Sequence, residues 1–266
     1  MFKQTGAYQV PNTIVWESSD GNFPKRQIYI SIPSVEAPSD GFPVLFVLDG
    51  NAWFGAITEF SRLQTRAPHG YPPAIIVGIG YETDEPFCRQ SRFYDFTEKV
   101  DSSELGQLKQ VQANQTGGVS SFLQFFENEL IPSLEKAYPL HQTKRALFGH
   151  SLGGLCVLHT LIHKSSLFST YIAGSPSIWW KEGYLKELVH SFKSLDVKDI
   201  LIGVGENEKG HMVDDAEWMY EQIRGKDHIE AQYICIPDTG HMSVVPPFLN
   251  TALKFFLATG AESGRL

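Results

Sequence analysis

Short apolar runs alternate along the chain with longer segments of mixed polarity, and the short runs predict β-strands. The first run, RQIYISIP, alternates between polar and apolar positions in the manner of a strand. The other runs are apolar nearly throughout, which is typical of strands buried on both faces of a sheet. The predicted strands span residues 26–33, 43–48, 74–80, 145–149, 170–174, 200–205 and 231–237.

The longer segments carry apolar residues at a helical period. Residues 120–138 show the pattern most fully, with apolar side chains close to every 3.6 residues, and residues 152–163, 214–224 and 247–257 have similar patterns. Alternation of strands and helices predicts an α/β fold, in which a mostly parallel central sheet is covered by helices on both faces. Neither an internal repeat nor a linker interrupts the pattern, so we expect a single domain over residues 1–266.

Residues 81–118 do not fit the alternation. They are rich in Arg, Asp, Glu, Gln and aromatic residues, and they predict a long loop insertion. Loops of this length inside a compact domain are usually functional or disordered. Because the segment follows a strand of the sheet, we expect it over the C-terminal edge, where open α/β sheets bind ligands. The insertion should therefore lie near the active site.

The sequence GHSLGG at residues 149–154 is a G-x-S-x-G motif in the context that this motif requires. It follows the predicted strand 145–149 and opens the predicted helix 152–163. The glycines let the backbone turn sharply and expose the serine, and the helix N-terminus favours developing negative charge. The motif predicts that Ser151 is the nucleophile of a serine hydrolase. The alternative is a glycine-rich turn with an incidental serine.

A serine hydroxyl is a poor nucleophile until a base takes its proton. In this strand–serine–helix arrangement the acid and then the histidine follow the nucleophile along the chain. His159 and His163 lie on the helix that leaves Ser151, too close in sequence to reach back, and His190 lies in a helical stretch before the later strands. Only His241 lies in a loop after a late strand and before the final helix. We therefore predict His241 as the general base.

The acid should follow the penultimate strand, where the sequence reads GVGENE. Glu208, three residues after the glycine that ends the strand, is the predicted acid, and Glu206 is the alternative. Asp214 and Asp215 are more distant candidates. All four could instead belong only to a loop and to the start of the next helix, where acidic residues are favoured.

Stabilisation of a tetrahedral oxyanion needs two main-chain N–H groups that point at the developing charge. The residue after the nucleophile, Leu152, should supply one of them. The loop after the predicted strand 43–48 reads DGNA and should supply the other, for which we predict the amide of Asn51. A plain strand-to-helix turn is the alternative for this loop.

Charge and composition narrow the class of protein further. The chain has a formal net charge of −8 and no cluster of Lys and Arg, which argues against a nucleic-acid or anionic-membrane partner. We find neither a secretory signal nor an apolar run long enough to span a bilayer. The three scattered cysteines indicate reduced thiols, and with them a cytoplasmic location. No metal-ligand or nucleotide-binding motif is present, so the predicted chemistry needs no cofactor.

Longer motifs carry a family resemblance over about residues 26–256. Through them the sequence resembles the Putative esterase family of α/β hydrolases, and within it the enterochelin esterase-like group, which includes ferric enterobactin and ferri-bacillibactin esterases. Two of the motifs, LDGNAWF and SPSIWW, are far more specific than G-x-S-x-G. The motifs include LDGNAWF, SRFYDFT, LFGHSLGGL, SPSIWW, GVGENEKGHM and DTGHMSVVP.

The resemblance implies an α/β-hydrolase fold and hydrolysis of the ester bonds in a tris-catecholate trilactone siderophore, which releases iron inside the cell. It supports the roles given above to Ser151, His241, Asn51 and Leu152. Relatives often carry aspartate where this chain has Glu208. A general carboxylesterase of the same family is the alternative function, and a non-catalytic binding module on a hydrolase scaffold is the least favoured.

A ferric tris-catecholate is a trianion, so its binding site should offer cations. The insertion supplies Arg89 and Arg92, and Arg92 lies in the SRFYDFT motif that the family shares. We expect Arg92 to bind substrate. The rings of Trp179 and Trp180 could stack on the flat catechol rings, so we expect these residues in the substrate site as well. The alternatives are solvated loop charge for the arginines and helix-to-sheet packing for the tryptophans.

Overall fold

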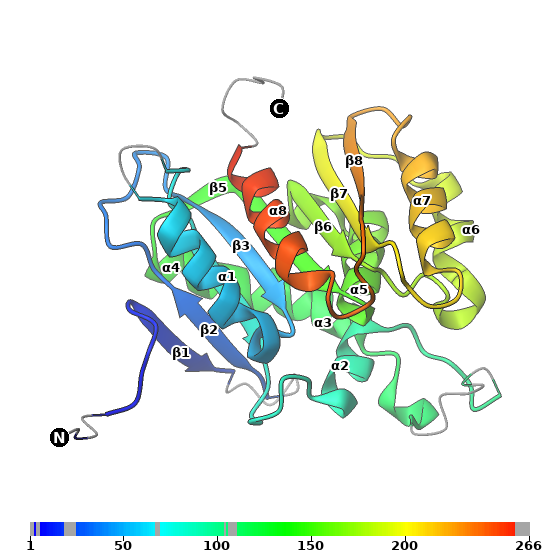
Figure 1. The fold of residues 1–266 in the computed structure, drawn as a ribbon, viewed down its shortest axis with the longest axis horizontal. Helices are drawn as coiled ribbons and strands as arrows, with labels where there is room; N and C mark the ends of the chain where they lie inside the picture. Colours follow the sequence, from blue (N-terminus) through cyan, green and yellow to red (C-terminus); the bar gives the residue numbers. More distant parts are fainter. Residues whose placement is uncertain are drawn as a thin grey trace.

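The computed structural model is built around one mixed β-sheet, as Figure 1 shows. It describes residues 3, 6–18, 25–66, 70–103, 105 and 111–258. Within these residues the sheet has eight strands in the order β1-β2-β4-β3-β5-β6-β7-β8. The pairs β1–β2 and β2–β4 are antiparallel, and every other pair is parallel. The strands are β1 Thr13–Glu17, β2 Gln27–Ser31, β3 Phe42–Leu48, β4 Ile75–Gly80, β5 Leu140–His150, β6 Thr170–Gly174, β7 Lys198–Gly205 and β8 Ile229–Ile236.

The prediction of a mostly parallel α/β sheet is confirmed, and each apolar run corresponds to one strand. Only β1 was not predicted. It lies at the edge of the sheet and none of its residues is buried, so it lacks the apolar signature of the central strands.

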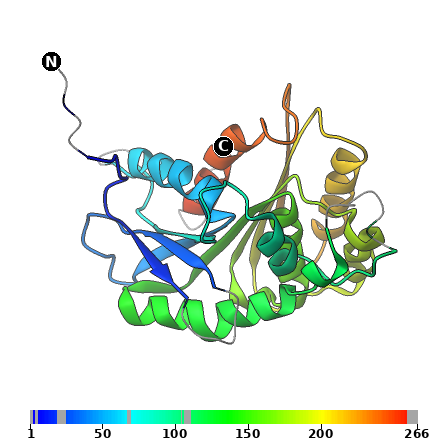
Figure 2. The ribbon, with the colours of Figure 1, turned by 90° about the horizontal axis from the view of Figure 1, so that it is seen from below.

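Helices cover both faces of the sheet (Figures 1 and 2). The helices α1 and α8 pack together on one face, and α3, α4, α5, α6 and α7 lie on the other. α1 and α6 were not among the segments predicted above from period alone. The helices are α1 Gly50–Gln64, α2 Arg89–Phe96, α3 Val119–Phe125, α4 Ile131–Ala137, α5 Leu152–His163, α6 Tyr184–Ser191, α7 Met212–Ile223 and α8 Val245–Ala258.

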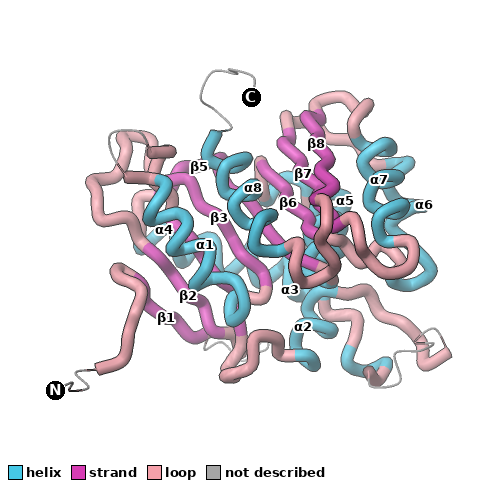
Figure 3. The backbone as a smooth tube through the Cα atoms, in the orientation of Figure 1, coloured by secondary structure: helices cyan, strands magenta, loops and turns pink. Residues whose placement is uncertain are grey.

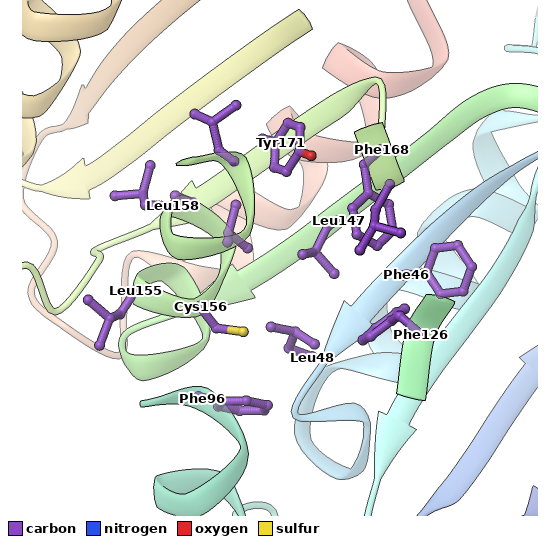
Figure 4. Close-up of a cluster of buried hydrophobic side chains, with 14 of the residues drawn as sticks. Phe46, Leu48, Phe96, Phe126, Leu147, Leu155, Cys156, Leu158, Phe168 and Tyr171 are labelled. Carbon is purple, nitrogen blue, oxygen red and sulfur yellow. The ribbon is translucent and has the colours of Figure 1, made fainter. Parts of the chain in front are cut away.

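Two buried apolar clusters hold these layers together, because neighbouring residues of a strand face opposite sides of the sheet. In β3, Phe46 and Leu48 belong to the cluster under α5, whereas Leu45 and Val47 belong to the cluster under α1 and α8. Figure 4 shows the first cluster, in which Phe96 of α2 lies with Leu48 and Cys156. The helix α2 is therefore part of the core.

The helix predicted over residues 120–138 is a continuous helical stretch with a change of winding in its middle. The π-helical turn η2, Phe126–Leu130, joins α3 to α4. The extra residue in such a turn shifts the direction of the side chains that follow it. Phe122 and Phe126, on either side of the junction, nevertheless both remain buried.

The prediction that residues 81–118 form a loop is wrong for part of that segment. Figure 3 shows α2 as a helix between stretches of loop, and the 3-10 turn η1, Ala113–Gln115, follows it. Residues 104 and 106–110 lie outside the described residues. Arg92 and Asp95 made α2 look like a solvated loop in the sequence, but both are partners in buried ion pairs. In the part of the chain that the structure describes, no helix is long and apolar enough to cross a membrane.

Candidate active site

Ser151 occupies a strained turn between β5 and α5. Its backbone angles are φ 61° and ψ −117°, a region that side-chain-bearing residues rarely adopt. The turn requires glycine at residue 149, since a Cβ there would lie 2.4 Å from the carbonyl carbon of Gly153. The carboxyl end of β5 and the glycines of the motif thus present the Ser151 side chain at the C-terminal edge of the sheet.

The side chains of Ser151, His241 and Glu208 form a hydrogen-bonded chain. The distance from His241 Nε2 to Ser151 Oγ is 3.0 Å, and the distance from His241 Nδ1 to Glu208 Oε2 is 2.8 Å. With the ring proton on Nδ1, His241 donates to the carboxylate and accepts the serine hydroxyl proton at Nε2. This geometry allows the imidazole to take the hydroxyl proton, while the carboxylate stabilises the imidazolium that results.

Glu208 is the carboxylate that the structure places on His241. Its side chain is fully buried, and its second oxygen accepts a hydrogen bond from Ser175. Burial acts to raise the pKa of Glu208, but the hydrogen bonds from His241 and Ser175 together hold it below its ordinary value. The alternative acid, Glu206, is exposed and accepts a hydrogen bond from the Asp238 main chain at 3.0 Å.

The loop that carries His241 is tied to the loop that carries Glu208. Asn207 N–H donates to the Thr239 carbonyl at 2.8 Å, and Glu206 N–H donates to the carbonyl of Ile236 at 3.0 Å. The acid and the base are consequently positioned as one unit. The two aspartates that the sequence left open lie elsewhere: Asp214 is 3.7 Å from the exposed His211, and Asp215 pairs with Lys186 at 2.6 Å.

The main-chain amides of Leu152 and Asn51 are without main-chain partners among the described residues. Each is in the first turn of a helix, where N–H groups have no carbonyl one turn earlier to bond. The Asn51 side chain fixes its own turn, because Nδ2 donates to the Tyr81 carbonyl at 2.9 Å and Oδ1 accepts from Tyr81 N–H at 2.8 Å. These amides are the two that the sequence predicted for an oxyanion hole.

Arg92 lies on α2 and its guanidinium is engaged by Asp49. Nε and a terminal nitrogen donate to the two carboxylate oxygens at 2.9 and 3.0 Å. Burial acts to lower the pKa of Arg92, but the Asp49 carboxylate holds it above its ordinary value. Only 12% of the Arg92 side chain is exposed. Binding of substrate by Arg92 stays a prediction, and the pairing leaves little of its charge available for it.

The two predicted tryptophans have different environments. Trp179 is 43% exposed. Trp180 is 1% exposed, packs on Phe93, and donates from Nε1 to the Glu98 carbonyl at 3.1 Å. This burial argues against the predicted stacking of Trp180 on a substrate ring, since neither face of the indole is accessible. Its role in the structure is packing.

A cleft of about 740 Å³ has Trp179 and Lys209 in its wall. Both are close in sequence to the hydrogen-bonded residues, since Lys209 follows Glu208 and Trp179 is two residues after Ser177, whose Oγ is 3.4 Å from Ser151 Oγ. Lys186 and His211 also line the cleft and have carboxylate partners. Lys209 has neither an ion pair nor a hydrogen bond among the described residues, and the carboxylates of Glu182, Asp214 and Asp215 line the same cleft.

Sequence reasoning missed three polar residues around the triad. Ser175 holds the acid, Ser177 lies against the nucleophile, and His150 packs on His241 with 4.7 Å between the ring centroids. Burial, assisted by the charge of His241, lowers the pKa of His150 to about 3, so this histidine is neutral. The motifs SPSIWW and GHSLGG contained all three, but a motif alone does not reveal which side chain faces the site.

The sequence profile of the Putative esterase family matches residues 24–236. The ferri-bacillibactin esterase BesA of Bacillus subtilis (strain 168) is 39% identical over 95% of this chain and 92% of its own. An apo-salmochelin esterase of Escherichia coli is 34% identical over 61% of this chain and 50% of its own. The crystal structure of the BES protein from Bacillus cereus superposes with a TM-score of 0.88 at 34% identity, over 96% of this chain and 99% of its own.

The fold and the match define an α/β-hydrolase-type esterase. The chain belongs to the Putative esterase family, as the sequence motifs indicated, and within that family it is similar to siderophore esterases over most of its length. It is a serine esterase that hydrolyses carboxylic esters.

Proposed function

We propose that this esterase hydrolyses the ester bonds of a tris-catecholate trilactone siderophore. The observation that carries the proposal is the hydrogen-bonded chain Ser151–His241–Glu208 in a sequence 39% identical, over 95% of its length, to a ferri-bacillibactin esterase. In this proposal Ser151 is the nucleophile, His241 the general base and Glu208 the acid that orients it. The amides of Asn51 and Leu152 form the oxyanion hole.

The first half of the reaction forms an acyl-enzyme. Ser151 Oγ attacks the carbonyl carbon of a lactone ester as its proton passes to His241 Nε2. The carbonyl oxygen becomes an oxyanion, which accepts hydrogen bonds from the amides of Asn51 and Leu152. When the tetrahedral intermediate collapses, the ester C–O bond breaks and His241 returns its proton to the departing alkoxide. The product is a ring-opened siderophore held as an ester of Ser151.

The second half releases the acid. Water attacks the acyl carbonyl as His241 takes one of its protons, and the same two amides stabilise the second oxyanion. Collapse breaks the bond to Ser151 Oγ, which recovers its proton from His241. These steps use only side chains and amides of this chain together with water, so the proposal invokes no cofactor.

The cleft lined by Trp179 and Lys209 offers two groups that a catechol ring can use. Trp179 is 43% exposed in its wall, and the Lys209 ammonium group has no ion-pair partner among the described residues. A flat ring bearing two oxygens can stack on the indole of Trp179 and pair through its oxygens with the ammonium group of Lys209. Lys209 follows Glu208 and Trp179 is two residues after Ser177, so in this proposal an arm of the substrate bound in the cleft has its ester linkage at Ser151.

Replacing Trp179 with alanine should lower kcat/KM for the trilactone by about tenfold, since stacking on an aromatic face contributes roughly 0.5–1.5 kcal/mol beyond area burial. Turnover of p-nitrophenyl acetate, which is too small to use the cleft, should change less than twofold. Leu195→Ala is the matched control, because Leu195 is 92% exposed and precedes β7 at the opposite edge of the sheet. If the ratio of kcat/KM for the trilactone to kcat/KM for p-nitrophenyl acetate were the same in Trp179→Ala as in the wild type, Trp179 would not belong to the substrate site.

Glu208→Gln should lower kcat far more than Glu206→Gln. The amide cannot stabilise the imidazolium, and it can hold His241 in the wrong tautomer, an effect that reached about 10⁴-fold for an Asp-to-Asn change in another triad. Glu206 contacts a main-chain amide and not the imidazole, so its variant should stay near the wild-type rate. Steady-state turnover of p-nitrophenyl acetate checks the ranking. The reverse ranking would transfer the role to Glu206, and equal small effects would indicate a Ser–His dyad.

Incubation of the purified protein with iron-free and ferric trilactones, followed by chromatography, tests the substrate. We expect both the ring-opened trimer and its shorter products to accumulate, and Ser151→Ala to produce none. Turnover of p-nitrophenyl acetate without any product from either trilactone would favour a general carboxylesterase. If the wild-type protein turned over neither p-nitrophenyl acetate nor a trilactone, only the non-catalytic binding module would remain.

The setting of the reaction is also part of the proposal. We propose that the chain works as one domain in the reducing cytoplasm, where a siderophore has already been imported. The support comes from Cys88, Cys156 and Cys235, which are all free thiols. The net charge of −8 supports a small-molecule substrate and neither a nucleic acid nor a membrane as partner.

A further inference from the structure

Asp49 controls the turn that leads from β3 into α1. Its backbone lies in the left-handed region, at φ 52° and ψ 50°, which favours glycine over other residues. Its carbonyl accepts from the amides of Ala52 at 2.9 Å and Trp53 at 3.2 Å. The preceding amides, those of Gly50 and Asn51, are therefore left to point outward from the helix N-terminus. The direction of the Asn51 amide depends on Asp49 keeping this conformation.

The Asp49 carboxylate lies between the two helices that carry the oxyanion-hole amides. Asp49 is 2% exposed, and its Oδ2 lies 3.5 Å from the position that a Cβ on Gly153 would occupy. Gly153 is in the first turn of α5, next to Leu152, and Asp49 itself precedes the first turn of α1. One buried side chain thus touches the starts of both helices.

An unpaired carboxylate in this place would oppose the reaction. A negative charge close to the oxyanion hole repels the oxyanion, and burial makes that repulsion stronger than it would be in water. The bidentate contact from Arg92, at 2.9 and 3.0 Å, cancels the charge. The guanidinium is itself held over the rings of Phe87 and Phe96, with 5.2 and 5.9 Å to their centroids.

The anchoring of α2 makes Arg92 a fixed partner. Asp95, one turn further along α2, accepts two hydrogen bonds from Arg26 at 2.9 and 2.7 Å and one from the Tyr81 hydroxyl at 2.8 Å. Arg26 is fully buried and directly precedes β2, and Tyr81 directly follows β4. Two buried ion pairs on one face of α2 therefore join this helix to the ends of β2, β3 and β4.

We propose that Asp49 and Arg92 form a positioning pair for the oxyanion hole. The pair fixes the turn that aims the Asn51 amide, spans the N-termini of α1 and α5, and keeps the buried carboxylate from repelling the oxyanion. This inference rests on the proposed function of the Asn51 and Leu152 amides in ester hydrolysis. It gives Arg92 a role in every ester that the protein hydrolyses, whereas a substrate contact would matter only for the siderophore.

The test compares Arg92→Met, Asp49→Asn/Arg92→Met and Arg62→Met on p-nitrophenyl acetate and on the trilactone. Arg62 is the matched control, since its guanidinium also pairs with a carboxylate, that of Glu59, but it lies in the last turn of α1 and its side chain is 49% exposed. We expect Arg92→Met to lower kcat about tenfold or more for both substrates, with KM nearly unchanged, because small displacements of catalytic groups cost rate and not ground-state binding. The double variant should recover at least about threefold of that loss, because no carboxylate is left unpaired. Arg62→Met should match the wild type.

Each outcome decides the proposal independently of the siderophore assignment, since p-nitrophenyl acetate reports on the oxyanion hole alone. A loss confined to the trilactone would make Arg92 a substrate contact and overturn the proposal, as would unchanged kcat values or a double variant no better than Arg92→Met. Thermal unfolding checks that each variant is folded. If Arg92→Met does not fold, the decisive comparison is between the double variant and the wild type. An unchanged kcat of the double variant for p-nitrophenyl acetate would then overturn the positioning role.

Discussion

Ser151→Ala should lower kcat for ester hydrolysis by about 10³-fold or more while the protein stays folded. Without the Oγ nucleophile no acyl-enzyme forms, and only stabilisation by the main-chain amides is left. Ser177→Ala is the matched control, because Ser177 Oγ lies 3.4 Å from Ser151 Oγ, whereas the hydroxyl that is hydrogen-bonded to His241 Nε2 is that of Ser151. Turnover of p-nitrophenyl acetate and circular dichroism spectra give the two readouts.

The Ser177 control should lose far less activity than Ser151→Ala. A Ser151→Ala protein that kept wild-type turnover would overturn the assignment of the nucleophile. A serine-reactive phosphonate provides an independent check, since it should label the wild type and the Ser177 variant but not the Ser151 variant.

His241→Ala should be nearly as damaging, and its combination with Ser151→Ala should be no worse than either change alone. The imidazole is 3.0 Å from Ser151 Oγ and acts on the hydroxyl proton, so the two side chains work as a unit and their effects should not add. Steady-state rates of the two single variants and the double variant measure this directly.

His211→Ala is the control for the histidine prediction, because the His211 side chain is 89% exposed and its ion-pair partner among the described residues is Asp214. It should keep the wild-type rate with p-nitrophenyl acetate, which is too small to use the cleft that His211 lines. An unaffected rate in His241→Ala would show that the base lies elsewhere, and His211 would be the next residue to examine.

The central strands and the strained turn at Ser151 could be predicted because their physical requirements leave a direct trace in the sequence. Strands buried on both faces, such as β3 and β4, must be apolar throughout, and the turn at Ser151 must have glycine at residue 149. The order of elements then put His241 in a loop at the same edge of the sheet. These features depend on local sequence and on topology alone.

The features that could not be predicted depend on pairs of residues distant in the chain. Arg92 and Asp95 are typical of a solvated loop until Asp49 and Arg26 are placed beside them, so α2 was missed. Glu206 and Glu208 are two residues apart and chemically alike, and only the position of His241 distinguishes them.

The tryptophans show the same limit. Trp179 and Trp180 are adjacent in sequence, yet one is 43% and the other 1% exposed. Lys181 and Glu182, which follow the two rings, both have positive φ, and nothing in the motif SPSIWW predicts this bend.

The two ion pairs of α2 divide the segment between β4 and α3 into two parts, of which only the first is held to the strand ends by these pairs. Residues up to Phe96 are bonded to the ends of three strands, so exchanging them between family members would disturb the sheet and the turn at Asp49 together. The described residues between Phe96 and α3 make none of these bonds. A chimaera built to transplant the substrate range of a relative should therefore place its recombination boundary after α2 and retain the helix of the recipient.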